Sequence, residues 1–167
     1  MRSSLGAAAM AAVLVMSGCA GYRLGATLPP GIKSVHVPAF INHSGESQLD
    51  TEATRAATQE FQRDGNLRLA SADKADAVLR VSLTRFTLEP LRYDRNDTKR
   101  AREYRIRITA DLALEKGGPG QTVLKQTVQG EATFDFTGDL SSAKMRAMPA
   151  ACRDLAHHIV SAVVEYW

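Results

Sequence analysis

A regular alternation of apolar and polar residues from Glu103 to Leu114 constrains the fold of this 167-residue chain more than any other feature. Every second side chain is apolar, namely Tyr104, Ile106, Ile108, Ala110, Leu112 and Leu114. Successive side chains of a β-strand point to opposite faces of a sheet, so the pattern predicts a strand with one buried and one solvated face. We therefore expect a sheet that packs on a core through one face only.

Two further long strands are expected beside this one in the sequence. Ala77–Glu89 alternates in the same way, but its apolar positions change phase near Thr84 and Arg85, which predicts a β-bulge there. Lys116–Gln121 contains three glycines and a proline and predicts a turn, after which Thr122–Phe136 returns as a strand. Shorter strands are expected at Ser34–Pro38 and Leu67–Leu69, and a charged loop at Pro90–Arg102.

Two amphipathic helices complete the expected domain. Apolar residues recur with helical spacing from Leu49 to Phe61, with Asp50 as the expected N-cap and Gly65 as the stop. A second helix is expected from about Leu140 to the end, with a buried stripe of Met145, Met148, Cys152, Leu155, Ala156, Ile159 and Val163. Cys152 is therefore interpreted as a core residue rather than a reactive thiol. The element order predicts an α+β fold in which both helices pack on one face of a mostly antiparallel sheet.

The N-terminus is typical of an exported lipoprotein. A short basic start and an apolar run of about a dozen residues predict a secretory signal at residues 1–18, since a membrane-spanning helix needs roughly 20 apolar residues. Met16-Ser17-Gly18-Cys19 resembles the bacterial lipobox, which implies that Cys19 is acylated. The alternative is an ordinary signal with a chance cysteine. Ala20 follows Cys19 and favours the outer membrane over the inner one. Residues 19–33 are then a tether, and residues 34–167 form one domain.

Charge and composition exclude several classes of function. The chain has 21 basic and 18 acidic residues, and loss of Arg2 with the signal leaves 20 against 18, too small a surplus to imply nucleic acid. The four histidines have no zinc-binding spacing, so no metal site is expected. Ser44-Gly45-Glu46-Ser47 has no base at a meaningful spacing, so no serine nucleophile is expected there. The glycines at 117–120 lie between two strands rather than before a helix, so they predict a turn and not a phosphate-binding loop. The sequence predicts neither an enzyme nor a cofactor.

One segment carries a local excess of positive charge. Its basic residues are Arg92, Arg95, Lys99, Arg100, Arg102, Arg105 and Arg107, against only three acidic residues. Arg105 and Arg107 are two positions apart on the expected strand, so they share a face, and two guanidinium groups so placed suit phosphate or carboxylate oxygens. The alternative is a solvated loop with self-compensating pairs.

Several motifs in order resemble the LPS-assembly lipoprotein LptE family. After the lipobox come Gly21-Tyr22-Arg23-Leu24 and Leu28-Pro29-Pro30-Gly31-Ile32-Lys33-Ser34-Val35, then Gln59-Glu60-Phe61-Gln62-Arg63-Asp64-Gly65 and Ala75-Asp76-Ala77-Val78-Leu79. Pro90-Leu91-Arg92-Tyr93-Asp94 and Glu103-Tyr104-Arg105-Ile106 complete the series. The resemblance covers nearly all of the chain after the signal, and its order and spacing carry it.

The resemblance implies two helices on a four-stranded sheet, with no enzymatic activity and no cofactor. It implies a lipoprotein anchored at the periplasmic face of the outer membrane that plugs the LptD β-barrel and binds lipopolysaccharide during its delivery. The residues that best match lipopolysaccharide contact are Arg92, Arg95, Lys99, Arg100, Arg105 and Arg107. The alternative function is a structural periplasmic lipoprotein that supports another envelope export or efflux complex. Tyr166 and Trp167 belong either to the core or to a partner contact.

Overall fold

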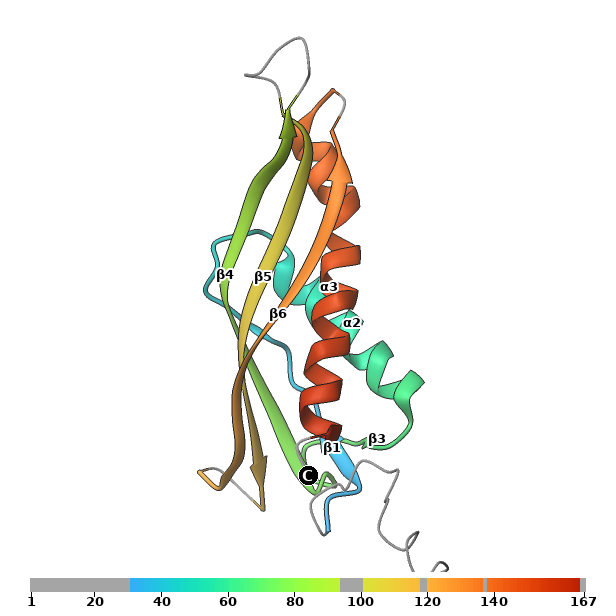
Figure 1. Ribbon diagram of the computed structural model, residues 1–167. Helices are drawn as coiled ribbons and strands as arrows, with labels where there is room; N and C mark the ends of the chain where they lie inside the picture. Colours follow the sequence, from blue (N-terminus) through green and yellow to red (C-terminus); the bar gives the residue numbers. More distant parts are fainter. Residues whose placement is uncertain (1–30, 94–100, 118–119, 137, 166–167) are drawn as a thin grey trace, which may run out of the picture.

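Three long strands and two helices make up most of the molecule, for which a computed structural model describes residues 31–93, 101–117, 120–136 and 138–165. The elements in chain order are β1 (Ser34–His36), β2 (Ile41–Asn42), α2 (Leu49–Asp64), β3 (Arg68–Leu69), β4 (Ala77–Tyr93), β5 (Ala101–Lys116), β6 (Thr122–Asp135) and α3 (Leu140–Glu165). Figure 1 shows β4, β5 and β6 as long neighbouring strands with α3 running beside them.

The sheet is mixed and has six strands in the described part of the chain. The strand order is β3-β1-β4-β5-β6, and β2 also pairs with β4. β4, β5 and β6 are antiparallel, whereas β1 pairs in parallel with β3 and β4, and β2 pairs in parallel with β4. The expected α+β class is confirmed, but the mostly antiparallel, four-stranded sheet was wrong. Strands were expected at the positions of β1 and β3 but not at β2, and all three are two or three residues long, too short for alternation to reveal how they pair.

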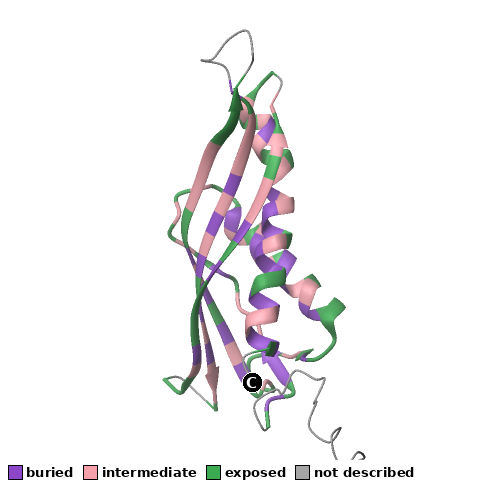
Figure 2. Ribbon diagram, viewed as in Figure 1, coloured by how far each residue is buried: buried purple, intermediate pink, exposed green. Residues whose placement is uncertain are grey.

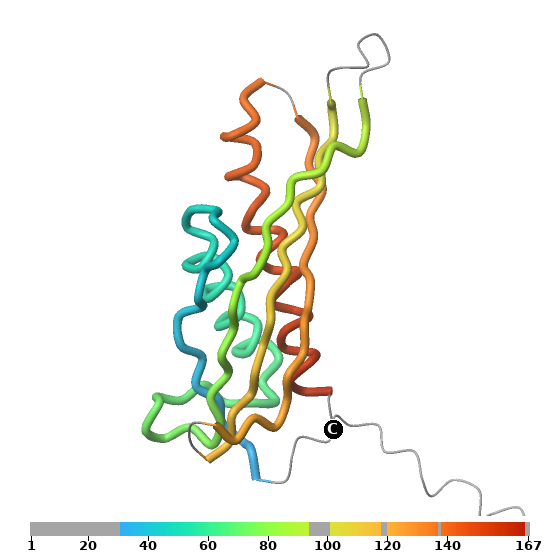
Figure 3. Tube along the Cα trace, turned by 90° about the vertical axis from the view of Figure 1, so that its left-hand side faces the viewer, coloured from blue at the N-terminus to red at the C-terminus, as the bar shows by residue number. Residues whose placement is uncertain are grey.

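Both helices pack on the face of the sheet that the alternation in β5 marks as apolar. Its residues Ile106, Ile108, Ala110, Leu112 and Leu114 are all buried, together with the inward residues of α2 and α3. Figure 2 shows the buried residues concentrated where the strands meet the helices, and Figure 3 shows α2 and α3 along the same side of the strands. Among the described residues, no helix lies on the other face of β4, β5 and β6.

β4 is bent and longer than its sequence pattern predicts. The pairing of β4 with β5 shifts between Leu83 and Arg85, which confirms the bulge expected there. The strand continues through Pro90 to Tyr93, and β5 already begins at Ala101, so most of the expected loop at Pro90–Arg102 is strand or lies at residues 94–100, outside the described residues. The predicted strand stopped before Pro90, because proline has no backbone N–H to donate to a neighbouring strand.

The ends of α2 agree only partly with expectation. Gly65 adopts a left-handed conformation with φ 74° and donates its N–H to the Phe61 carbonyl, as expected of a helix stop. At the other end, Gln48 is the N-cap with φ 62°, makes no capping hydrogen bond with its side chain, and leaves Asp50 inside the first turn. The predicted Asp50 cap was therefore wrong by two residues. Ile32 is the first buried residue in the described part of the chain.

Candidate functional site

The helix-free face of β4, β5 and β6, here called the open face, carries the residues of greatest functional interest. Residues paired across neighbouring strands point to the same face, so the pairing assigns each charged side chain. Positive charges come from Arg80, Arg85, Arg92, Arg105, Arg107 and Lys125, and negative charges from Glu89, Glu103, Asp111, Glu115, Glu131 and Asp135. The six positive and six negative charges among the described residues balance.

Arg105 and Arg107 share a carboxylate on the neighbouring strand. Arg107 Nε donates to Glu131 Oε1 at 2.6 Å, and Arg107 Nη1 donates to Glu89 Oε1 at 3.1 Å. Arg105 Nε lies 3.4 Å from Glu131 Oε2 but forms no hydrogen bond within the described part of the chain, although that nitrogen is buried. The hydrogen bond from Arg107 lowers the pKa of Glu131, and the same bond raises the pKa of Arg107. The expected pair of guanidinium groups exists on one face, but two carboxylates already offset its charge.

Arg92 lies near the end of β4 on the same face. Its guanidinium contacts Glu103 Oε2 at 3.4 Å through Nε and Asp135 Oδ1 at 3.1 Å through Nη2. These surface ion pairs contribute little to stability, because exposed charges are well solvated. Three of the expected contact residues therefore share the open face, while Arg95, Lys99 and Arg100 lie outside the described residues, as does Cys19.

The β4 bulge adds residues to this face that sequence reasoning missed. A hollow of about 310 Å³ is lined by Thr84, Arg85, Thr87, Glu89, Arg107, Thr109 and Gln129. Arg85 is exposed, is paired with Thr109 of β5, and has no charged partner in the parts of the chain that are described. Glu89 and Glu131 were missed because they are 18 and 24 residues away from Arg107 in the sequence, and only strand register brings them together.

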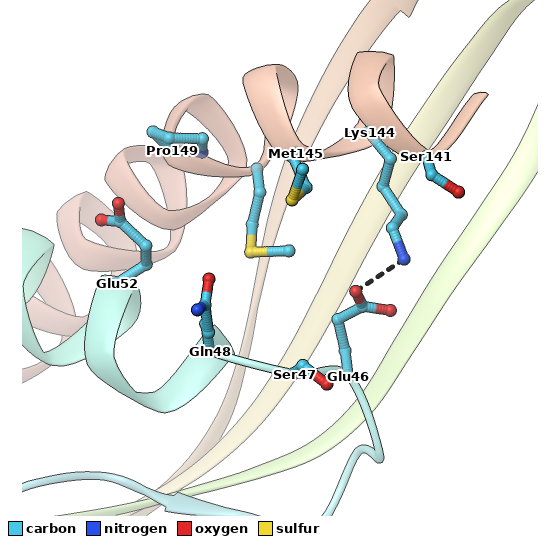
Figure 4. Close-up of a pocket in the computed structure, with 9 residues that line it drawn as sticks. Glu46, Ser47, Gln48, Glu52, Ser141, Lys144, Met145 and Pro149 are labelled. Atoms are coloured by element: carbon cyan, nitrogen blue, oxygen red, sulfur yellow. Dashed lines mark hydrogen bonds and ion pairs between the residues drawn. The ribbon is translucent and has the colours of Figure 1, made fainter. Parts of the chain in front are cut away.

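A second cavity lies on the helix side, between the loop before α2 and the first half of α3 (Figure 4). Its volume is about 460 Å³, and its walls include Gln48, Met145, Met148 and Pro149. The side chain of Lys144 closes one end through an ion pair with Glu46 at 2.6 Å. Met145 is 60% exposed and lines this cavity, so its expected burial was wrong.

Catalytic chemistry finds little support in the described residues. No group of three or more His, Cys, Asp or Glu side chains there is arranged to hold a metal ion. Burial raises the pKa of Cys152 to about 12, so its thiol stays protonated at neutral pH. His157 lies 3.5 Å from Glu60, and His158 lies 3.7 Å from Asp154, both on exposed surface. Neither helix in the described ranges is long and apolar enough to cross a membrane.

Comparison with known proteins gives a family and a fold. A sequence family described as "LptE: Lipopolysaccharide-assembly" matches residues 32–163. No curated protein sequence matches the chain. Similar solved structures include lipoprotein B from Nitrosomonas europaea, with a TM-score of 0.57 and 13% identity over 87% of this chain and 92% of that one.

Two other solved structures have the same fold. A minor lipoprotein from Acinetobacter baumannii has a TM-score of 0.50 and 16% identity, and the match covers 81% of this chain and 93% of that one. A hypothetical protein from Chlamydia trachomatis has a TM-score of 0.57 and 10% identity, covering 81% and 97%. At such identities the likeness concerns the fold alone.

Proposed function

This chain belongs to the LptE lipopolysaccharide-assembly family, and we propose that it is an acylated outer-membrane lipoprotein, the partner and plug of an LptD-type β-barrel. In this role it also binds lipopolysaccharide during its delivery to the outer leaflet. The protein acts by binding and assembly, not by catalysis, and needs no cofactor. Acylation at Cys19 holds it at the periplasmic face of the outer membrane.

The open face is the observation that best supports a plug. It extends over three long strands and is predominantly polar, with six positive and six negative charges in the described residues. The interior of a membrane β-barrel is polar and hydrated, in contrast to its lipid-facing surface. A balanced, largely hydrophilic face suits such a lumen, because Arg80, Arg92, Arg105 and Arg107 are already paired with carboxylates of the same face.

Lipopolysaccharide contact is proposed for the turn end of the same face. Arg92, Arg105 and Arg107 lie there, and the sequence continues from β4 into Arg95, Lys99 and Arg100. Guanidinium groups can exchange a carboxylate for a phosphate oxygen, because both anions accept the same forked hydrogen bonds. Glu131 and Glu89 then act as internal counter-ions that the phosphate must displace or bridge.

Purification from detergent extracts tests the barrel partnership. We expect the full-length lipoprotein to recover a large outer-membrane barrel protein in stoichiometric amount. Recovery of another export or efflux complex, with no barrel, would favour a supporting structural role and contradict the plug.

Lipopolysaccharide binding is tested separately with neutral variants. Arg105→Gln combined with Arg107→Gln should weaken binding about tenfold or more, since a hydrogen bond to a charged group contributes about 1.5–3 kcal/mol. Glutamine is preferred to glutamate because reversal would crowd new carboxylates around Glu131. Arg153→Gln, on the exposed surface of α3, is the matched control. Binding to lipopolysaccharide and to a dephosphorylated form is measured across a salt series, and equal binding by all variants would contradict this role.

A further inference from the structure

The upper part of β4 has an unoccupied edge. β2 pairs with β4 only at Ser82 and Leu83, and the last backbone bond on that side runs from His43 N–H to the Leu83 carbonyl. Beyond it, no described strand or loop bonds to that edge of β4, although β4 continues to Tyr93. Figure 1 shows the loop to α2 passing the edge of β4 at mid-height while β4 rises above it.

The direction of the free backbone groups follows from the hydrogen bonds of β5. Phe136 N–H donates to the Arg102 carbonyl, so even-numbered residues of β5 turn their backbone groups toward β6. Odd-numbered residues of β5 therefore bond to β4, where Arg85, Thr87 and Glu89 are paired with them. The groups of Phe86 and Leu88 consequently point away from β5, into the unoccupied edge.

Irregularities at both ends limit this edge to a short window. Below it, the bulge between Leu83 and Arg85 shifts the register, and above it the register shifts again after Pro90. Like Phe86 and Leu88, Pro90 turns its backbone groups away from β5 and toward the unoccupied edge. Its lack of an N–H therefore removes no hydrogen bond within the sheet. Bulges and prolines protect edge strands from open-ended pairing, so the window from Arg85 to Pro90 has room for one short strand.

We propose that the window from Arg85 to Pro90 on β4 is a docking site for an extended segment of the barrel partner, which adds to the sheet as a further strand. This inference rests on the proposed function. Backbone bonds to Phe86 and Leu88 supply affinity, as in other cases of strand addition, and alternate side chains supply specificity.

The side chains of β4 define what the added segment must carry. On the helix side, Phe86 and Leu88 are half-buried beside the core and match apolar residues of the segment. On the open face, Arg85 has no charged partner in the described ranges, whereas Glu89 is already bonded to Arg107. The segment therefore alternates apolar with polar residues and places a carboxylate beside Arg85.

A second copy of this chain does not fit the same window. Antiparallel pairing of two β4 strands about Thr87 would set Leu91 of one copy against Leu83 of the other. That position is occupied by Asn42 of β2, which pairs with Leu83. A short segment that enters and leaves the edge avoids this overlap, which favours a different chain as the occupant.

Residue-resolved hydrogen–deuterium exchange on the purified barrel complex tests the proposal. In the free protein the amides of Phe86 and Leu88 should exchange fast, while those of Thr87 and Glu89, bonded to β5, exchange slowly and serve as internal controls. In the complex the exchange of Phe86 and Leu88 should slow by about tenfold or more. In parallel, Arg85→Glu should weaken barrel recovery by about tenfold, whereas Arg153→Glu should not.

Each outcome distinguishes the inference from the proposed function. A complex that forms without slower exchange at Phe86 and Leu88 overturns the docking site and leaves the barrel partnership intact. Failure to recover a barrel at all overturns both. Slow exchange of these two amides in the protein alone, dependent on its concentration, would identify a second copy as the occupant and overturn the proposed one.

Discussion

Gly130 is a residue at which α3 approaches the sheet closely. A Cβ built there would lie 2.4 Å from the Leu155 backbone nitrogen and 2.5 Å from its Cα. The neighbouring Glu131 N–H donates to Asp154 Oδ2 on the same helix at 2.8 Å. Helix backbone therefore packs directly against strand backbone, and only glycine leaves the necessary space.

Gly130→Ala should lower the free energy of unfolding by about 1–3 kcal/mol, because the atoms in the way are backbone and the whole helix must shift. Gln129→Ala, next in sequence on the open face, should change it by less than about 0.5 kcal/mol. Urea unfolding of both variants measures the difference. Equal stability would show that α3 lies farther from β6 than described.

Cys152 should be unreactive in the folded protein. Burial raises its pKa to about 12, so almost no thiolate forms at neutral pH, and the side chain is only 1% exposed. We expect a thiol reagent to label the folded protein at pH 8 at least tenfold more slowly than the protein in urea. Fast labelling under native conditions would contradict the core position.

At the scale of the elements, one carboxylate joins the first strand to the central one. Asp76 Oδ2 accepts hydrogen bonds from the Lys33 and Ser34 backbone N–H groups and from Ser34 Oγ, at 2.9, 3.0 and 2.8 Å. The Asp76 N–H donates in return to Ser34 Oγ. Asp76 thus holds the start of β1 beside the start of β4.

Asp76→Asn should remove a stabilisation that depends on pH. The hydrogen bond from Lys33, followed by that from the Ser34 hydroxyl, lowers the pKa of Asp76 below its ordinary value. A lowered pKa in the folded state means that the stabilisation is complete above the ordinary aspartate pKa of about 4 and disappears as the pH falls through the lowered value. Urea midpoints of the original and variant proteins should therefore differ at pH 7, and the difference should shrink as the pH falls below about 4. A constant difference would argue against this role.

At the scale of the whole molecule, the two faces of the sheet have separate tasks. One face and both helices form the core, and the other remains hydrophilic over three strands. Substitutions in the core should therefore affect stability, and substitutions on the open face should affect recognition. Phe86 and Leu88 are the exception, because they pack beside the core and also lie at the proposed docking edge of β4.

Cys19→Ala should leave the protein uncleaved or released from the outer membrane. Several acyl chains, each contributing about 0.8 kcal/mol per buried CH₂, make membrane anchoring stable, and the proposed anchor depends on that one thiol. Fractionation with metabolic palmitate labelling measures the effect, with Cys152→Ala as the matched control. Palmitate incorporation into the Cys19→Ala variant would contradict the lipobox assignment.

The sequence by itself determined the long strands, both helices, the β4 bulge and the family. These features depend on spacing within a few residues, since side chains alternate along a strand and recur along a helix. Tertiary structure decided the parallel strands, the continuation of β4 through Pro90 and the exposure of Met145. It also decided that Arg105 and Arg107 share Glu131, because the register of the strands determines which carboxylates lie beside each arginine. The sequence shows which residues are charged, whereas the fold decides which charges meet.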